Sequence, residues 1–295
     1  FDKKTFSDLA KKKRKGPLTI ISATDMSSGA RFDFIQETFD FICSDLNRFP
    51  ISRAVAASSA VPLLFSPVTL WNYAGTCDFH VPDTLMAAAD NKKRGRIAAV
   101  SRTRAKELFS YLDPIKRPYI HLLDGGLSDN LSIRSILDME ALVGSEEVRQ
   151  DFRLDEMEKL VLVVVNAQNN PENTIDQSAD VPGWRDVIRA ISDIPIARYT
   201  QETELAMQSS IERWQEAARL RAEQNNTAPP SVYYINVSLK NMTDEEKRID
   251  LLNVPTSLYL PKKTVRELRG AATTLLHESP EFRRLLKDIS AKQGD

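Results

Sequence analysis

The residues best suited to chemistry in this sequence are an aspartate and the two glycines after it. Asp124 directly follows the apolar run 119–123 and precedes Gly125 and Gly126. The run is typical of a strand, and ligands of α/β proteins bind beyond the carboxyl ends of strands. Glycines there let a partner approach and permit backbone angles closed to other residues. Such a carboxylate can accept a proton from a nearby hydroxyl, although an Asp-Gly turn without chemistry is the alternative interpretation.

Two further stretches precede this motif. Residues 20–25 read Ile-Ile-Ser-Ala-Thr-Asp, and residues 54–65 form an alanine- and serine-rich segment that contains Pro62. Together with residues 123–130, and in this order, they resemble patatin-like phospholipases. In that family a strand ending in Thr-Asp precedes an alanine- and serine-rich helix ending in proline, and a later strand delivers D-G-G with an asparagine shortly after. The resemblance covers roughly residues 17–165.

The resemblance implies a lipid acyl hydrolase that uses a Ser-Asp dyad. The serine would attack the ester carbonyl, and Asp124 would take its proton and later activate water on the acyl-enzyme. Gly125 and Gly126 would support the catalytic loop, and Asn130 would either cap the following helix or brace that loop. The expected substrate is a phospholipid or a related acyl ester, and neither a metal nor an organic cofactor is expected.

The other half of such a site is missing from the sequence. No G-x-S-x-G elbow occurs between residues 1 and 295, and no glycine-rich turn offers an oxyanion hole. Ser58 and Ser59 lack flanking glycines and indicate close helix packing instead. We therefore expect the serine upstream of Phe1 and predict that the 295-residue chain alone is inactive. A non-catalytic patatin-fold module for lipid binding or scaffolding is the alternative.

The histidines give little support to a classical triad or a zinc site. His121 lies three residues before Asp124 on the same predicted strand, and an odd offset places the two side chains on opposite faces. His121 is therefore expected to be packed or solvated. No motif surrounds His80 or His277.

Charge and composition restrict the partners further. The net charge of −1 predicts no general nucleic-acid footprint. One basic run indicates a solvated helix end or loop, with contact to an anionic membrane surface as the alternative; it consists of Lys11, Lys12, Lys13, Arg14 and Lys15. No apolar run approaches the roughly 18 residues that span a bilayer. We expect a soluble or membrane-peripheral protein, exported if a signal precedes it.

The two cysteines leave the redox compartment open. Cys43 and Cys77 are the only ones in the sequence, so they form either a single disulfide or two buried thiols.

Strands alternate with helices along the chain, which predicts an α/β fold. Expected strands cover residues 18–24, 31–34, 119–123, 160–165 and 231–237, and residues 63–70 are expected to be loop and strand. Expected helices cover 51–60, 82–112 with a break near Asn91, 132–142, 196–223, 243–252 and 262–277. The resemblance implies a three-layer sandwich with a mainly parallel sheet between helical layers. The apolar run 160–165 is typical of a central strand covered on both faces.

The domain expectation follows from the resemblance. Residues 1–165 would be the C-terminal portion of the catalytic domain, and residues 166–295 the remaining strand and helical layer or a C-terminal extension.

Overall fold

The protein is an α/β chain that divides into two compact units in a computed structural model. Unit 1 comprises Phe1–Phe152 and Arg189–Glu204, and unit 2 comprises Arg153–Ile188 and Leu205–Asp295. The structure describes residues 3–9, 17–62, 64–143, 157–169, 175–257 and 259–291. The basic run at residues 11–15 lies outside these ranges, as does Leu63 of the alanine- and serine-rich segment.

Unit 1 is built on a four-stranded sheet. Its strands are β1 (Ser22–Asp25), β2 (Arg31–Asp33), β3 (Val68–Trp71) and β4 (Tyr119–Leu123), in the order β2-β1-β4-β3. Every pairing is antiparallel, unlike the mainly parallel sheet expected from the sequence. A short turn causes the first of these pairings, because the chain returns directly from β1 to β2. Gly29 permits that turn with a φ of 71° and donates its N–H to the Asp25 carbonyl.

Helices surround this sheet, and the apolar core lies against one of its faces. They are α1 (Phe6–Leu9), α2 (Gln36–Phe41), α3 (Ile51–Ser58), α4 (Asp83–Ala89), α5 (Arg96–Phe109), α6 (Gly126–Asp129) and α7 (Arg134–Val143). Burial alternates along β4 as a strand requires. Ile120 and Leu122 are fully buried in the core, whereas Tyr119 and His121 are exposed on the other face.

A disulfide joins Cys43 to Cys77 across 34 residues of unit 1. It settles the alternative that the sequence left open, because neither cysteine is a free thiol.

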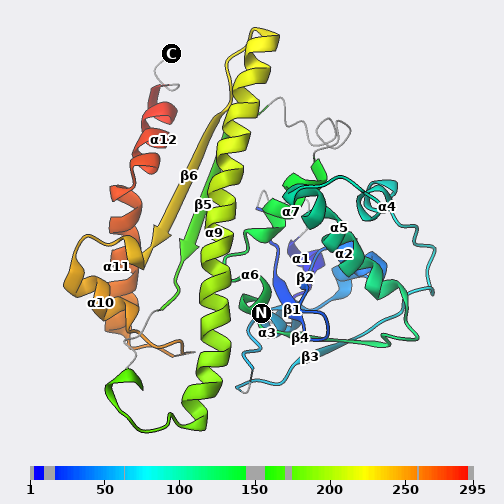
Figure 1. Ribbon diagram of the computed structural model, residues 1–295, viewed down its shortest axis with the longest axis horizontal. Helices are drawn as coiled ribbons and strands as arrows, with labels where there is room; N and C mark the ends of the chain where they lie inside the picture. The colour runs from blue at the N-terminus through cyan, green and yellow to red at the C-terminus, as the bar shows by residue number, and fades with distance from the viewer. Residues whose placement is uncertain are drawn as a thin grey trace. The chain divides into compact units, whose positions relative to one another are not determined.

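Unit 2 contains a two-stranded parallel sheet. Strands β5 (Lys159–Asn166) and β6 (Ser231–Ser238) pair along their whole length (Figure 1). Helices α10 (Glu245–Leu252), α11 (Lys262–Glu278) and α12 (Pro280–Ala291) follow, and α11 and α12 pack against β6. Buried residues of β6 and of these helices form the core, among them Tyr233, Ile235, Leu275 and Leu285.

The apolar strand of unit 2 does not have the position that its composition indicates. Among the described strands, β5 pairs only with β6, and Val161, Val163 and Val165 are 41%, 50% and 64% exposed. The expectation of a central strand covered on both faces is therefore wrong. A run of β-branched residues records a preference for extended backbone, and it does not specify how many neighbours the strand acquires.

Two helix boundaries also differ from expectation, both at prolines. Helix α9 runs from Trp184 to Asn225 with Pro195 inside it, whereas the sequence predicts a start at Ile196. Helix α12 was not expected, and it begins at Pro280, a residue well suited to the first position of a helix.

Candidate functional site

The three stretches singled out in the sequence meet at the end of β4. The backbone N–H of Asp124 donates to the Ala60 carbonyl at 3.0 Å, and that of Gly125 donates to the Ser58 carbonyl at 3.1 Å. The Thr24 hydroxyl donates to the Asp124 carbonyl at 2.7 Å. The end of β1 and the end of α3 therefore hold the Asp124 loop through its own backbone.

Gly125 is required by a close approach of the backbone. A Cβ at this position would lie 2.5 Å from the Ser22 carbonyl oxygen, closer than any real contact. Its φ of −64° is ordinary, and Gly126 does not have a positive φ either. The close approach at Gly125 is thus made by the chain's own backbone, and the expectation of backbone angles closed to other residues is wrong for both glycines.

The Asp124 carboxylate has one oxygen held and one available. Its Oδ1 accepts a hydrogen bond from the Gly126 N–H at 2.8 Å, and its Oδ2 has no hydrogen-bond partner within the described part of the chain. The side chain is half-buried. Burial raises the pKa of Asp124 above its ordinary value, and the hydrogen bond from Gly126 offsets only part of that rise. The group is therefore a stronger base than an exposed aspartate, which suits proton transfer from a hydroxyl.

Asn130 lies at the end of α6 and does not accept from the next helix. Its Nδ2 donates to the Thr200 hydroxyl at 3.3 Å, and its Oδ1 lies 3.0 Å from where a Cβ on Gly126 would be. Asp129 instead accepts from the backbone N–H groups of Ile133 and Arg134 at the start of α7. The sequence suggests two roles for Asn130, capping of the next helix or bracing of the loop. Asp129, and not Asn130, caps α7.

A buried cluster of charges supports the segment after Asp124, and sequence reasoning missed it. Arg31 of β2 pairs with Asp33 at 2.8 Å, with Asp138 of α7 at 2.9 Å, and with Asp129 of α6 at 3.8 Å. Arg104 of α5 pairs with Asp33 at 3.2 Å. Burial raises the pKa of Asp129, although Arg31 acts in the opposite direction. The only signal in the sequence is the Arg-Phe-Asp alternation of β2, which places two charged side chains on the face away from the core.

Asp25, at the end of β1, has a different environment. Its carboxylate is fully buried and accepts hydrogen bonds from Arg117, from the Tyr111 hydroxyl at 3.0 Å and from the Ser27 N–H at 2.9 Å. Burial alone would raise the pKa of Asp25, but the bonds from Arg117 and Ser27 outweigh it and hold the pKa below its ordinary value. A carboxylate satisfied in this way fixes structure and is poorly suited to take a proton.

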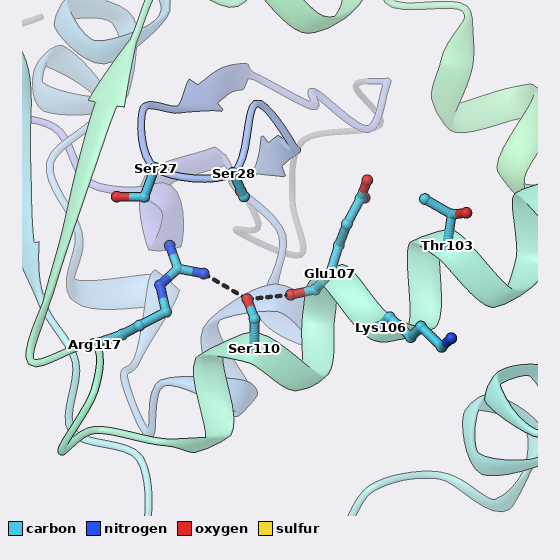
Figure 2. Close-up of a pocket in the computed structure, with 7 residues that line it drawn as sticks. All are labelled: Ser27, Ser28, Thr103, Lys106, Glu107, Ser110 and Arg117. Atoms are coloured by element: carbon cyan, nitrogen blue, oxygen red, sulfur yellow. Dashed lines mark hydrogen bonds between the residues drawn. The ribbon is translucent and has the colours of Figure 1, made fainter.

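A shallow pocket of about 400 Å³ lies beside Arg117, between the turn after β1 and helix α5. The Arg117 guanidinium donates a hydrogen bond to the Ser110 hydroxyl, and that hydroxyl donates to the backbone carbonyl of Glu107 (Figure 2). The same guanidinium pairs with Asp25, so its charge is already compensated. None of the residues 124–130 lines this pocket.

Among the described residues, no hydrogen bond joins a histidine to Ser58 or Ser59. His121 Nδ1 lies 2.9 Å from the Thr69 hydroxyl on the exposed face of the sheet, as expected for a solvated residue. The Ser59 hydroxyl donates to the Val55 carbonyl within α3. Ser58 lies closer to the loop, with its Oγ 3.5 Å from where a Cβ on Gly125 would be.

Within the described ranges, no group of three or more His, Cys, Asp or Glu side chains is arranged to hold a metal ion. No described helix is both long and apolar enough to cross a membrane. No family model, curated protein or solved structure matches the chain. Function is therefore inferred from the residues around Asp124 and from the motifs that meet there.

Proposed function

We propose that this protein is a lipid acyl hydrolase of the patatin-like type, in which Asp124 is the acidic member of a Ser-Asp dyad. The proposal rests above all on the Asp124 carboxylate, which is half-buried, held through one oxygen by Gly126 and unpartnered at the other within the described residues. The serine would come from outside residues 1–295, because these contain no G-x-S-x-G elbow. The substrate class is the carboxylic ester of a phospholipid or related lipid.

In the proposed reaction the two carboxylate oxygens of Asp124 have different roles: Oδ2 transfers protons and Oδ1 fixes the orientation of the group. Oδ2 of Asp124 would take the serine proton as the serine oxygen attacks the ester carbonyl, and would then deliver it to the leaving alcohol. In the second half, the same oxygen would take a proton from water as the water oxygen attacks the acyl carbon. It would then return that proton to the serine oxygen as the free acid leaves. The raised pKa of Asp124 favours both proton uptakes. The Gly126 N–H keeps Oδ1 in place, so that Oδ2 stays oriented.

The resemblance also carries a fold proposal, a patatin-like three-layer sandwich. Helices on both faces of β1 support it. Ala54 and Ala57 of α3 belong to the same core as Ala23, and Ser128 of α6 lies 2.8 Å from Thr24, whose side chain is on the opposite face. The expected parallel strands are the part of this proposal that the pairing within unit 1 does not support.

The test is hydrolysis of a chromogenic short-chain acyl ester by the complete natural polypeptide that contains residues 1–295. Replacing Asp124→Asn should lower kcat by about 10²–10⁴-fold, the usual contribution of a general base. Asp113→Asn, a change at an aspartate with a partly exposed side chain in the same unit, is the matched control and should leave kcat unchanged. Ser58→Ala should also leave kcat unchanged.

Three outcomes would contradict the proposal. An Asp124→Asn variant with full activity would remove the dyad, and rapid turnover by residues 1–295 alone would place the nucleophile within this chain. A complete polypeptide that binds lipid but hydrolyses no ester would favour the alternative, a non-catalytic module.

A further inference from the structure

Three hydrogen bonds fix the backbone around Asp124. The Asp124 N–H donates to the Ala60 carbonyl at 3.0 Å, and the next N–H, that of Gly125, donates to the Ser58 carbonyl at 3.1 Å. The carbonyl of Asp124 accepts from the Thr24 hydroxyl at 2.7 Å. The planar peptide group between Asp124 and Gly125 is therefore held at both of its polar atoms. Because the N–H of Asp124 is fixed as well, the direction in which its side chain leaves the backbone is fixed.

Thr24 is the one of these three partners that acts through its side chain. Ala60 and Ser58 contribute backbone carbonyls, which almost any residue at those positions supplies. The bond from Thr24 requires a hydroxyl, and β1 delivers that hydroxyl because Thr24 pairs with Leu123 across the two strands. Thr24 is only 4% exposed, so water has little access to take over its hydrogen bond.

Ser128 of α6 determines where the Thr24 proton points. The two hydroxyl oxygens lie 2.8 Å apart, and both residues are buried. Each hydroxyl has a single proton to donate, and the Asp124 carbonyl can only accept. Thr24 therefore gives its proton to that carbonyl and accepts the proton of Ser128. The Gly125 carbonyl is a weaker acceptor for Ser128, because it lies 3.4 Å away.

The orientation of the Asp124 carboxylate depends on this backbone arrangement. The Gly126 N–H reaches Oδ1 at 2.8 Å, and it does so while residues 124–126 keep their conformation. Without the Thr24 hydroxyl, the Asp124 carbonyl would have lost its donor in a buried place, which is costly enough to turn the peptide group toward another donor. That rotation moves the Gly126 N–H away from Oδ1. The other oxygen, Oδ2, then has no fixed direction.

We propose that Thr24, with its proton directed by Ser128, is the positioning residue of the Asp124 carboxylate. Thr24 acts through the Asp124 backbone and takes no proton in the reaction. The inference rests on the proposed function for its catalytic meaning. The orientation of the carboxylate can be measured without catalysis, however, so the two proposals can fail separately.

The first experiment follows the Gly126 amide resonance of the 295-residue chain by NMR as the pH is varied. An amide that donates to a carboxylate changes its chemical shift when the carboxylate ionises, and Asp124→Asn identifies the part of this titration that belongs to Asp124. Thr24→Val should reduce that part by at least half, whereas Thr24→Ser keeps the hydroxyl and should retain it. Thr38→Val, the same substitution at a buried threonine of α2, is the matched control and should also retain it. An unchanged Gly126 titration in a folded Thr24→Val variant would overturn the inference.

Circular dichroism and urea unfolding report whether each variant is folded. If Thr24→Val does not fold, Ser128→Ala takes its place, because the Thr24 proton then loses the donor that directs it. The Asp124 part of the Gly126 titration should again fall by at least half, and an unchanged titration would overturn the inference.

The second experiment measures ester hydrolysis by the complete natural polypeptide. Thr24→Val should lower kcat by about 10–100-fold with KM unchanged, because a misplaced catalytic group loses most of its effect. Thr24→Ser should restore kcat. Full activity of Thr24→Val beside an inactive Asp124→Asn would overturn the inference and leave the proposed function standing. A polypeptide that hydrolyses no ester, but whose Gly126 titration depends on Thr24, would contradict the proposed function and support the positioning of Asp124 by Thr24.

Discussion

Asp25 ends β1 and Asp124 follows the end of β4, and these two strands are antiparallel neighbours in one sheet. The two carboxylates have opposite environments. Asp25 ends β1, and its Cα pairs with that of Leu122 on β4, two residues before Asp124. Asp25 is fully buried, and Arg117, Tyr111 and Ser27 all donate to it. Asp124 is half-buried and accepts one backbone hydrogen bond within its own loop. Their pKa values accordingly move in opposite directions, down for Asp25 and up for Asp124.

The difference separates a structural carboxylate from one suited to react. Charge and hydrogen bonds that stabilise the ionised form make a carboxylate a weak base, whereas burial without compensation makes it a stronger one. Asp25 and its partners secure the turn after β1 and the approach to β4. Asp124 keeps one oxygen available, and its loop is held by Thr24, Ser58 and Ala60.

The largest expected effect is on stability at Asp25. Asp25→Asn removes the charge that compensates Arg117, and breaking a buried pair from one side costs about 3–5 kcal/mol of unfolding free energy. Asp124→Asn removes no ion pair and should change the unfolding free energy by less than about 1 kcal/mol. Urea unfolding of both variants measures the contrast. Similar losses at the two sites would show that the distinction between them is wrong.

A smaller loss of unfolding free energy is expected when Asp25 loses the hydrogen bond from the Tyr111 hydroxyl. Tyr111→Phe removes the hydroxyl that donates to the Asp25 carboxylate, a hydrogen bond to a charged group worth about 1.5–3 kcal/mol. The ring stays in the core, so no cavity forms. Tyr259→Phe, at a residue that is 79% exposed, is the control and should leave the urea midpoint unchanged. An unchanged midpoint in Tyr111→Phe would mean that Arg117 and Ser27 alone satisfy Asp25.

The two glycines after Asp124 should respond differently to the same methyl group. Gly125→Ala forces a Cβ against the Ser22 carbonyl, which is backbone, and should cost about 1–3 kcal/mol. At Gly126 a Cβ would meet the Asp124 and Asn130 side chains at 3.0 Å, and these can move. Gly126→Ala should therefore change stability by less than about 1 kcal/mol but displace Asp124 Oδ1 and lower ester hydrolysis. Thermal unfolding and the ester assay together test this, and a stable, fully active Gly125→Ala variant would contradict it.

The sequence predicts the strand and the motif at Asp124, but it does not predict the distant residues that hydrogen-bond to Asp25 and Arg31. The strand 119–123 and the Asp124 motif follow from an apolar run stopped by glycines, and β4 has those bounds. The partners of Asp25 could not be predicted, because Tyr111 and Arg117 are 86 and 92 residues away along the chain. The partners of Arg31 were missed for the same reason, since Asp138 is 107 residues away.

The sequence also could not predict which strands pair or whether they pair in parallel. Alternation and composition identify β1, β4 and β5 as extended segments, but they carry no information on direction or neighbours. The apolar composition of β5 therefore predicts a central strand, although three of its valines are exposed.

The smallest expected effect is a difference in how stability depends on pH. The pKa of Asp25 is lowered on folding, so its stabilisation is present above the unfolded value of about 3.9 and is lost as the pH falls through the folded pKa. The pKa of Asp124 is raised, so its contribution is present below about 3.9 and is lost as the pH rises through the folded pKa. Urea unfolding between about pH 3 and about pH 7 should thus show the stability of Asp124→Asn increasing relative to the unchanged chain as the pH rises. The stability of the unchanged chain should increase relative to that of Asp25→Asn as the pH rises, and this change should occur at lower pH than the change for Asp124→Asn. A flat difference for Asp124→Asn would mean that solvent reaches its carboxylate too freely for Asp124 to be a strengthened base.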